Sequence, residues 1–352
     1  MKKILAMLLA VMMLLSVASV AMAEDAEPTD APATPTYSDH GTVTLTKTYK
    51  LVGDGVSPAE TFKYTIEKVS VTDAASTVTK ENMPVPTFAD GKGEITFNSG
   101  EAVATTGTSK NLTINLPTYE SVGVYTYTIK ETPSKTLGVT YDGNAYTLVV
   151  TVIHGENGLI REVALRKTGA TTKSDAAAFE NTYTANKLSV TKNVTGKLGD
   201  QSKKFKFKVR FANQNPNNTE MKSTVTATIA GAEDSTFSFS FTEDYTFELS
   251  HGQTAVFANL PAGITYKVFE LDENNEVISD TEKQMNGNYT VSYDNDKEGL
   301  TNGTAKQTTI TNTYEGSIDT GVMLDSMPYV LVLAVVGAAV IALIAKKRRA
   351  ED

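Results

Sequence analysis

The sequence predicts an all-β protein with two tandem β-sandwich domains, an N-terminal signal peptide and a C-terminal transmembrane helix. From Gly41 onward Thr, Val, Tyr and Phe are frequent, and apolar residues alternate with polar ones, as in half-buried strands. Asp-Gly pairs at residues 54–55, 90–91 and 142–143 interrupt these runs in the manner of β-hairpins. No long helical period occurs before the terminal apolar segment, so a sandwich architecture is favoured.

An internal repeat predicts two related domains. The first half opens with TVTLTK at residues 42–47 and closes with FENTY at 179–183. The second half opens with KLSVTK at residues 187–192 and closes with ITNTY at 310–314. The boundary between the two halves falls at residues 184–186. The predicted organisation is a signal peptide over 1–23, a leader without a fold over 24–39, a first sandwich over 40–184, a second sandwich over 185–315, a sorting-signal region over 316–328, a transmembrane helix over 329–345 and a basic tail over 346–352.

Both chain ends indicate export to the cell surface. A basic start, an apolar stretch at residues 4–20 and the Ala-Met-Ala site at 21–23 are typical of a secretory signal peptide; an uncleaved membrane helix is the alternative. Residues 329–345 carry no charge and precede four cationic residues at 346–349, the arrangement of a short membrane span with an internal tail. A buried core helix is the alternative, but such helices are rarely apolar on every face.

Composition excludes several classes of function. The chain has a formal net charge of −9, which disfavours a nucleic-acid partner. With no Cys, it lacks the disulfides that usually brace small exported domains. Its three His residues have no zinc spacing, and no Gly-rich phosphate loop occurs, so neither a metal nor another cofactor is predicted.

Strand parity places six polar residues on apolar faces. Residues two apart on a strand share a face, so a residue's neighbours at that spacing tell which side it occupies. In each half, a penultimate strand ending in Glu is predicted to precede the closing strand. A single Lys or Glu at a strand end can reach out to water, but six residues in phase across two repeats favour burial. The six predicted buried residues are Lys47, Glu131, Asn181, Lys192, Glu270 and Asn312.

Burial would make these residues reactive. Desolvation disfavours charge, so the pKa of a buried Lys falls and that of a buried Glu rises, by up to ~3 to 5 units. The Lys becomes a free amine and hence a nucleophile. A neutral Glu can polarise the Asn carbonyl and give a proton to its leaving nitrogen. The predicted product is a Lys-Asn amide, formed with loss of ammonia, that joins the first strand of each domain to the last.

With these motifs, the chain resembles the two-domain backbone pilins of Gram-positive bacteria, which are built from immunoglobulin-like sandwiches of the collagen-adhesin B type. The resemblance implies a cross-link from Lys47 to Asn181 with Glu131 as the proton-transfer residue. It implies a second from Lys192 to Asn312 with Glu270.

The same resemblance implies assembly by a sortase, which in this family cuts between Thr and Gly before the membrane span. The matching pair is Thr320 and Gly321, with Asp319 where the family usually has Pro, which leaves the sortase class open. By position before the last strand of the first domain, Lys173 is similar to the family's polymerising lysine. Lys167 is an alternative acceptor, and an ordinary solvated lysine is the simpler reading of both.

The sequence therefore predicts a structural cell-surface protein, a pilus shaft subunit, and no enzyme beyond its own cross-linking. Its implied partners are a sortase, neighbouring copies of itself, minor or tip pilins, and host or surface ligands. A wall-attached adhesin with the same domains that never polymerises is the alternative function. A hydrolase or lectin would need a polar cluster that the sequence does not offer.

Overall fold

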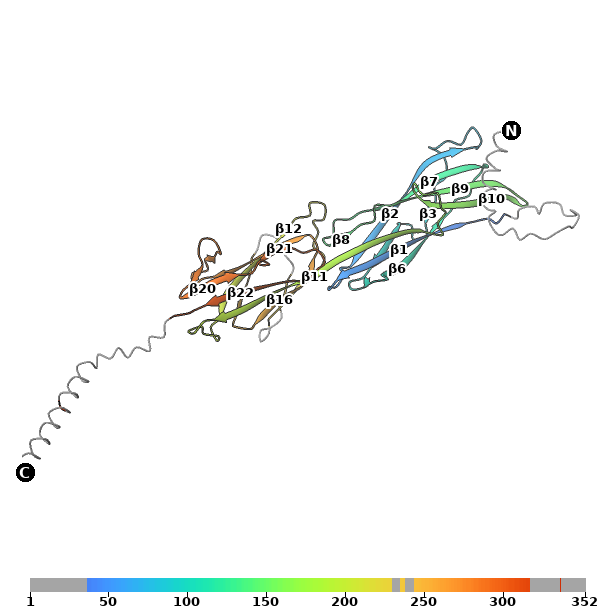
Figure 1. The fold of residues 1–352 in the computed structure, drawn as a ribbon. Helices are drawn as coiled ribbons and strands as arrows, with labels where there is room; N and C mark the ends of the chain where they lie inside the picture. Colours follow the sequence, from blue (N-terminus) through green and yellow to red (C-terminus); the bar gives the residue numbers. More distant parts are fainter. Residues whose placement is uncertain (1–36, 230–234, 238–243, 317–335, 337–352) are drawn as a thin grey trace, which may run out of the picture. The chain divides into compact units, whose positions relative to one another are not determined.

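The computed structural model describes residues 37–229, 235–237, 244–316 and Val336, and outside that single residue its regular elements are strands. The fold class predicted from the sequence, an all-β chain of two sandwiches, is confirmed (Figure 1). The helix search over the described residues yields none long and apolar enough to cross a membrane. The predicted signal peptide lies outside the described residues, as does the predicted membrane span apart from Val336.

The first sandwich faces two sheets across one core. One sheet has the order β3-β6-β1-β11, with β5 beside β1 and β8 beside β11, and the other has the order β10-β9-β7-β2-β4. Tyr49, Phe62 and Phe97 meet edge to face between the sheets, with ring centroids 5.1 to 5.8 Å apart. The strands are β1 (Thr42–Gly53), β2 (Glu60–Thr72), β3 (Thr87–Phe88), β4 (Glu94–Phe97), β5 (Val103–Ala104), β6 (Thr108–Asn115), β7 (Gly123–Thr132), β8 (Val139–Thr140), β9 (Ala145–Gly155), β10 (Gly158–Lys167) and β11 (Ala177–Thr195).

The second sandwich has its own core. Its first sheet continues from β11, with β16, β13 and β14 on one side and β22, β20 and β19 on the other. The facing sheet has the order β15-β12-β17-β18, with β21 beside β17. Phe207 and Phe257 each pack on Phe247 between the sheets. The strands are β12 (Phe205–Asn213), β13 (Val225–Ile229), β14 (Ser235–Phe237), β15 (Asp244–Leu249), β16 (Thr254–Pro261), β17 (Ile264–Leu271), β18 (Val277–Ile278), β19 (Met285–Asn286), β20 (Tyr289–Tyr293), β21 (Glu298–Leu300) and β22 (Lys306–Thr313).

Strand β11 belongs to both sandwiches. Its first half pairs in parallel with β1 and its second half in parallel with β22, so one uninterrupted strand passes the predicted boundary (Figure 1). Along it the buried residues are odd-numbered as far as Ala185 and even-numbered from Asn186 onward. A register shift against β16 between Asn186 and Leu188 accompanies this change. Because a shift of one residue exchanges the two faces of a strand, β11 turns a different side chain set toward each core.

The glutamate-bearing strands are not penultimate, which corrects the sequence-based expectation. Strands β8, β9 and β10 follow β7 before the first sandwich closes with β11, and β18 to β21 follow β17 before β22. The Glu strand in each case lies in the sheet that faces the one holding the first and last strands. Sequence order alone does not reveal which sheet a strand joins, because strands adjacent in sequence need not pair with each other.

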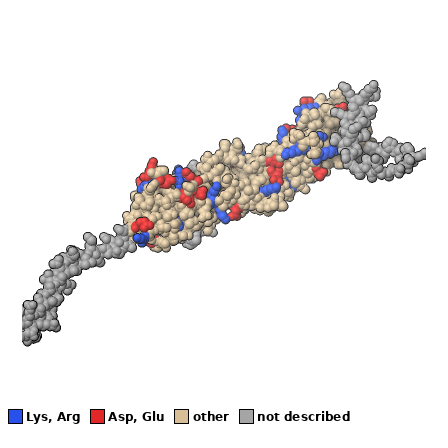
Figure 2. All heavy atoms as spheres, viewed as in Figure 1, with Lys and Arg blue, Asp and Glu red and all other residues tan. Residues whose placement is uncertain are grey.

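The predicted leader ends in residues that contact the first sandwich. Asp39 pairs with Arg161 of β10, with Oδ2 2.6 Å from the guanidinium, and this contact lowers the pKa of Asp39 to about 2. On the face seen in Figure 2, cationic and anionic side chains lie interspersed among wide uncharged areas. The partly exposed Lys50 pairs with Glu180 at 2.7 Å.

Candidate cross-linking sites

The two lysine-asparagine pairs lie on neighbouring parallel strands with identical register. Lys47 of β1 is opposite Phe179 of β11, two residues before Asn181. Lys192 of β11 is opposite Ile310 of β22, two residues before Asn312. A two-residue offset keeps each pair on one face of its sheet, and that face is the buried one. Each Lys therefore reaches diagonally toward its Asn inside the core.

The glutamate of each site comes from the facing sheet. Glu131 lies on β7 and Glu270 on β17, and both point across the core toward the strands that carry Lys and Asn. The burial predicted from strand parity is confirmed for all six residues, because none is more than 8 % exposed. Three strands that are distant in sequence thus supply each site.

In the first site, Glu131 bridges the other two residues. Lys47 Nζ lies 2.5 Å from Oε2, and Asn181 Nδ2 donates to Oε1. The carbonyl oxygen of Asn181 accepts a hydrogen bond of 2.7 Å from the backbone N–H of Asp142. This donor points at the oxygen on which negative charge would develop if an amine attacked the amide carbon, as in an oxyanion hole.

In the second site, the lysine contacts the amide directly. Lys192 Nζ donates to Asn312 Oδ1, lies 3.1 Å from Glu270 Oε2, and is 3.4 Å from the Ile310 carbonyl oxygen. Asn312 Nδ2 donates to Glu270 Oε1 at 2.7 Å. The carboxyl again lies between the lysine amine and the amide nitrogen of the asparagine.

Burial moves the charged groups toward their neutral forms. Desolvation lowers the pKa of Lys47 to about 8, although the carboxyl of Glu131 pulls it upward. Desolvation likewise lowers the pKa of Lys192 to about 8 against the pull of Glu270. The pKa of Glu131 is raised, again chiefly by burial and against the effect of Lys47. Proton transfer from Lys47 to Glu131 is therefore easier here than in water.

Aromatic rings complete both sites. Lys47 Nζ lies 4.2 Å from the ring centre of Phe62, and Lys192 Nζ lies 4.4 Å from that of Phe205. These rings exclude water and hold the amine near the amide, which raises its effective concentration. The alternation of Lys with Phe at residues 203–208 belongs to this feature, since Phe205 and Phe207 of β12 face the core while Lys206 is exposed.

Two polar contacts at these sites escaped sequence analysis. The sequence pattern places Asp142 only in an Asp-Gly turn, yet its backbone N–H donates to the side-chain carbonyl oxygen of Asn181. Asn286 is buried and donates to Glu270 Oε1. Both contacts join residues at least 16 positions apart, so no local sequence pattern announces them.

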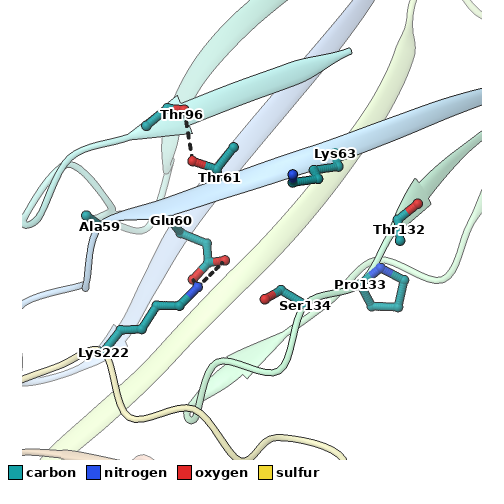
Figure 3. A pocket seen from close by; sticks show the side chains of 9 residues that line it. All are labelled: Ala59, Glu60, Thr61, Lys63, Thr96, Thr132, Pro133, Ser134 and Lys222. Carbon is teal, nitrogen blue, oxygen red and sulfur yellow. Dashed lines mark hydrogen bonds and ion pairs between the residues drawn. The ribbon is translucent and has the colours of Figure 1, made fainter. Parts of the chain in front are cut away.

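A separate pocket of about 500 Å³ adjoins the Glu60 side chain (Figure 3). Glu60 is buried; its carboxyl accepts a hydrogen bond of 2.6 Å from Thr136 and lies 3.2 Å from Lys222. These partners engage both carboxyl oxygens, which supports a structural ion pair linking β2 to the segment before β13. The lining residues are Ala59, Glu60, Thr61, Lys63, Thr96, Thr132, Pro133, Ser134 and Lys222.

The remaining predicted site residues concern assembly. Lys173 is exposed in the loop between β10 and β11, and Lys167 is exposed at the end of β10. Asp319, Thr320 and Gly321 lie outside the described residues. Among the described side chains, no cluster of three or more His, Cys, Asp or Glu is arranged to hold a metal ion.

Comparison with known proteins agrees with this arrangement. Residues 43–184 match the family described as Spy0128-like isopeptide containing domain, and residues 186–314 match a domain of unknown function (DUF7601). A curated pilin from Streptococcus pyogenes serotype M1 is 30 % identical over 235 residues, which cover 63 % of this chain and 67 % of the relative.

Two solved structures align with most of this chain. The major pilin of Streptococcus pyogenes aligns with 79 % of this chain and 100 % of its own, at 23 % identity and a TM-score of 0.47. The major pilin T3.2 of serotype GAS13637 aligns with 79 % of this chain and 99 % of its own, at 23 % identity and a TM-score of 0.46. These structural scores are low, so the assignment rests on the sequence relative and the matched domain.

Tandem sandwiches, the first of them of the isopeptide-containing type, define a class of structural surface proteins rather than enzymes. Within that class, the chain belongs to the pilin family of Gram-positive bacteria and is a pilus shaft subunit. It is accordingly a cell-surface pilus component.

Proposed function

We propose that this shaft subunit is stabilised by two autocatalytic isopeptide bonds, Lys47 to Asn181 and Lys192 to Asn312. The observation that carries the proposal is the repetition of one geometry: a buried Lys and Asn at the same register offset on parallel strands, with a Glu from the facing sheet between them. A chance ion pair in one core would not recur with the same offset in the other.

The proposed reaction is balanced within each site. Glu131 takes a proton from Lys47 Nζ, and the free amine attacks the side-chain carbonyl carbon of Asn181. The Asp142 N–H stabilises the oxygen of the tetrahedral intermediate. Glu131 then gives this proton to Asn181 Nδ2, the bond between the carbonyl carbon and Nδ2 breaks, and ammonia leaves. Glu131 takes a second proton from Lys47 Nζ and ends protonated. A secondary amide between the two side chains remains.

Each bond would close a very large loop. The closed loops run from residue 47 to 181 and from 192 to 312, each well over a hundred residues. On the chain-entropy account used for disulfides, a loop of this size contributes roughly 4 to 5 kcal/mol to stability. This contribution replaces the disulfides that a chain without Cys lacks.

Intact mass of the purified ectodomain, covering both sandwiches, tests the bonds. The expected mass lies two ammonia molecules below that of the sequence. Replacing Glu131 or Glu270 by Ala should restore one ammonia each, because the proton carrier is lost while Lys and Asn remain. Peptides joined through Lys47 and Asn181 would locate the first bond. An undiminished mass in the unchanged chain would refute the proposal.

We also propose that export, sortase cleavage between Thr320 and Gly321, and transfer to a lysine of a neighbouring copy build the fibre. A signal peptide over 1–23 and a membrane span over 329–345 would hold the subunit at the membrane until cleavage. Lys173 is the proposed acceptor, supported by its exposed position in the loop before β11. Minor or tip pilins and host ligands would join the finished fibre.

Surface extracts resolved on a denaturing gel test polymerisation. A ladder of covalent multimers is expected for the unchanged chain and for Lys167→Ala, which serves as the matched control. The ladder should disappear in Lys173→Ala, and Lys167→Ala should remove it if the neighbouring lysine is the acceptor instead. A single band from the unchanged chain would favour the alternative function of an adhesin that never polymerises.

A further inference from the structure

Asn286 is a buried polar residue at the second site that the proposed reaction does not consume. It lies on the short strand β19 and is 6 % exposed. Its Nδ2 donates to Glu270 Oε1 at 2.7 Å and to the Leu271 carbonyl oxygen at 3.3 Å. Burying an amide is costly unless it is hydrogen-bonded, and both of these partners belong to the glutamate-bearing strand β17. Asn286 therefore reaches across the sandwich to the carboxyl.

This contact gives Glu270 a distinct set of partners on each oxygen. Oε1 accepts from both Asn312 and Asn286, each at 2.7 Å, whereas Oε2 faces Lys192 at 3.1 Å. Rotation of the carboxyl out of its present plane would break the hydrogen bonds to Oε1. The amide of Asn286 opposes that rotation, because Nδ2 is a donor only and has its acceptors at fixed positions on β17.

The first site is built differently. At the first site, Lys47 donates to Oε2 of Glu131 and Asn181 donates to Oε1, while the Asp142 N–H donates to the Asn181 carbonyl oxygen. At the second site the corresponding carbonyl, that of Asn312, accepts from Lys192 itself. One site thus has its extra donor on the electrophile and the other on the proton carrier.

We propose that Asn286 is a positioning residue for the second cross-link, one that keeps Glu270 oriented between Lys192 and Asn312. Asn286 also remains in place when the Asn312 nitrogen leaves as ammonia. Glu270 Oε1 therefore keeps one hydrogen-bond donor at the step that removes the Asn312 donor. A buried carboxyl oxygen left without a donor would raise the free energy of that step. This inference rests on the proposed cross-link.

The test compares the rates at which the two bonds form in one chain. Unreacted ectodomain, recovered in denaturant, is refolded, and ammonia loss in each sandwich is followed by mass spectrometry of its cross-linked peptides. Asn286→Leu removes the donor at similar volume, and Asn286→Asp replaces it with an acceptor. Asn286→Gln retains an amide as the conservative rescue. The first bond serves as the internal control.

A hydrogen bond to a charged group corresponds to roughly a ten- to hundredfold change in rate. The second bond should therefore form roughly ten- to a hundredfold more slowly in the Leu and Asp variants, with the first bond unaffected and the Gln variant close to the unchanged chain. If the Leu variant lacks β-sheet circular dichroism, the Asp variant decides.

Formation of the second bond at the unchanged rate in a folded Leu or Asp variant would overturn the inference. Equal slowing of both bonds would do so too, since it would indicate a general folding defect. If the unchanged chain forms the first bond but never the second, the proposed cross-link itself fails, and the role of Asn286 fails with it. That result is distinguishable, because it appears before any substitution is made.

Discussion

Lys47 and Lys192 have charges that depend on the burial of their side chains. In water a lysine is protonated throughout the physiological range, whereas each of these has a pKa of about 8 in its site. The fraction present as free amine therefore changes steeply just where cells and buffers operate. In the proposed reaction this proton passes through the glutamate to the nitrogen that leaves, so bond formation depends on whether the site still holds it.

The rate of cross-linking should accordingly fall above pH 8. Below 8 the pair keeps the proton that Glu131 passes from Lys47 to Asn181, so the rate should change little; above 8 that proton is lost to solvent, and the rate should fall roughly tenfold per pH unit. Denatured, unreacted ectodomain refolded at pH values on either side of 8 and followed by ammonia loss gives the profile. Asn181→Ala removes the first-site signal and serves as the control. A rate that does not fall above 8 would show that the reaction does not need the proton shared by Lys47 and Glu131.

How far the sequence predicted these sites depends on the kind of contact. Lys47, Glu131 and Asn181 were found because each follows the two-residue alternation of its own strand, a local pattern that records burial. Asp142 and Asn286 were missed because their roles arise from contacts across the sandwich. Asp142 contributes a backbone N–H, which carries no residue-specific signal, and Asn286 lies on a strand too short for alternation to be visible.

At the scale of elements, strand β11 was also only partly predictable from the sequence. The repeat of opening and closing motifs predicts a boundary at residues 184–186, and the alternation of buried residues along β11 shifts at Ala185 and Asn186. The sequence suggested two strands meeting at a boundary, but the structure has one. Continuity depends on backbone pairing with β1, β16 and β22, partners that lie far away along the chain.

A glycine follows the point where the pairing of β11 with β22 ends. Gly196 follows β11 with a φ of +93°, and a Cβ there would overlap the Tyr314 carbonyl. Gly252 has a φ of +76° with no atom within 4 Å of such a Cβ, so it is a matched control for the backbone cost alone.

Gly196→Ala should destabilise the second sandwich more than Gly252→Ala does. The left-handed backbone costs an alanine about 1 to 2 kcal/mol at either position, and the overlap should add at least ~1 kcal/mol at Gly196. Chemical denaturation in the Glu270→Ala background, where no cross-link masks the difference, measures both. Equal losses of unfolding free energy in the two variants would mean that the chain near Gly196 relaxes around the added Cβ at no cost.

At the scale of the whole molecule, the two proposed bonds would determine which residues bear tension. Force applied to the ends would pass from Lys47 to Asn181, along β11 to Lys192, and on to Asn312. Residues 48–180 and 193–311 would lie outside this path. Unfolding either sandwich by pulling would then require breaking a covalent bond.

Single-molecule stretching should therefore show no unfolding step in the unchanged ectodomain. In Glu131→Ala the first sandwich should unfold and release about 130 residues, or roughly 450 Å of chain at ~3.5 Å per residue. Glu270→Ala should give one step of similar size from the second sandwich. An unchanged ectodomain that lengthens by the same step would contradict the proposed path of force.

The shared strand also imposes an order in time. A chain is synthesised from its N-terminus and folds domain by domain in that direction. The first sandwich is complete only once β1 has paired with the beginning of β11, and the same strand then continues as the first strand of the second sandwich. Once the first sandwich is closed, the second half of β11 is in place as the strand with which β16 and β22 pair. Folding of the first sandwich would therefore nucleate folding of the second.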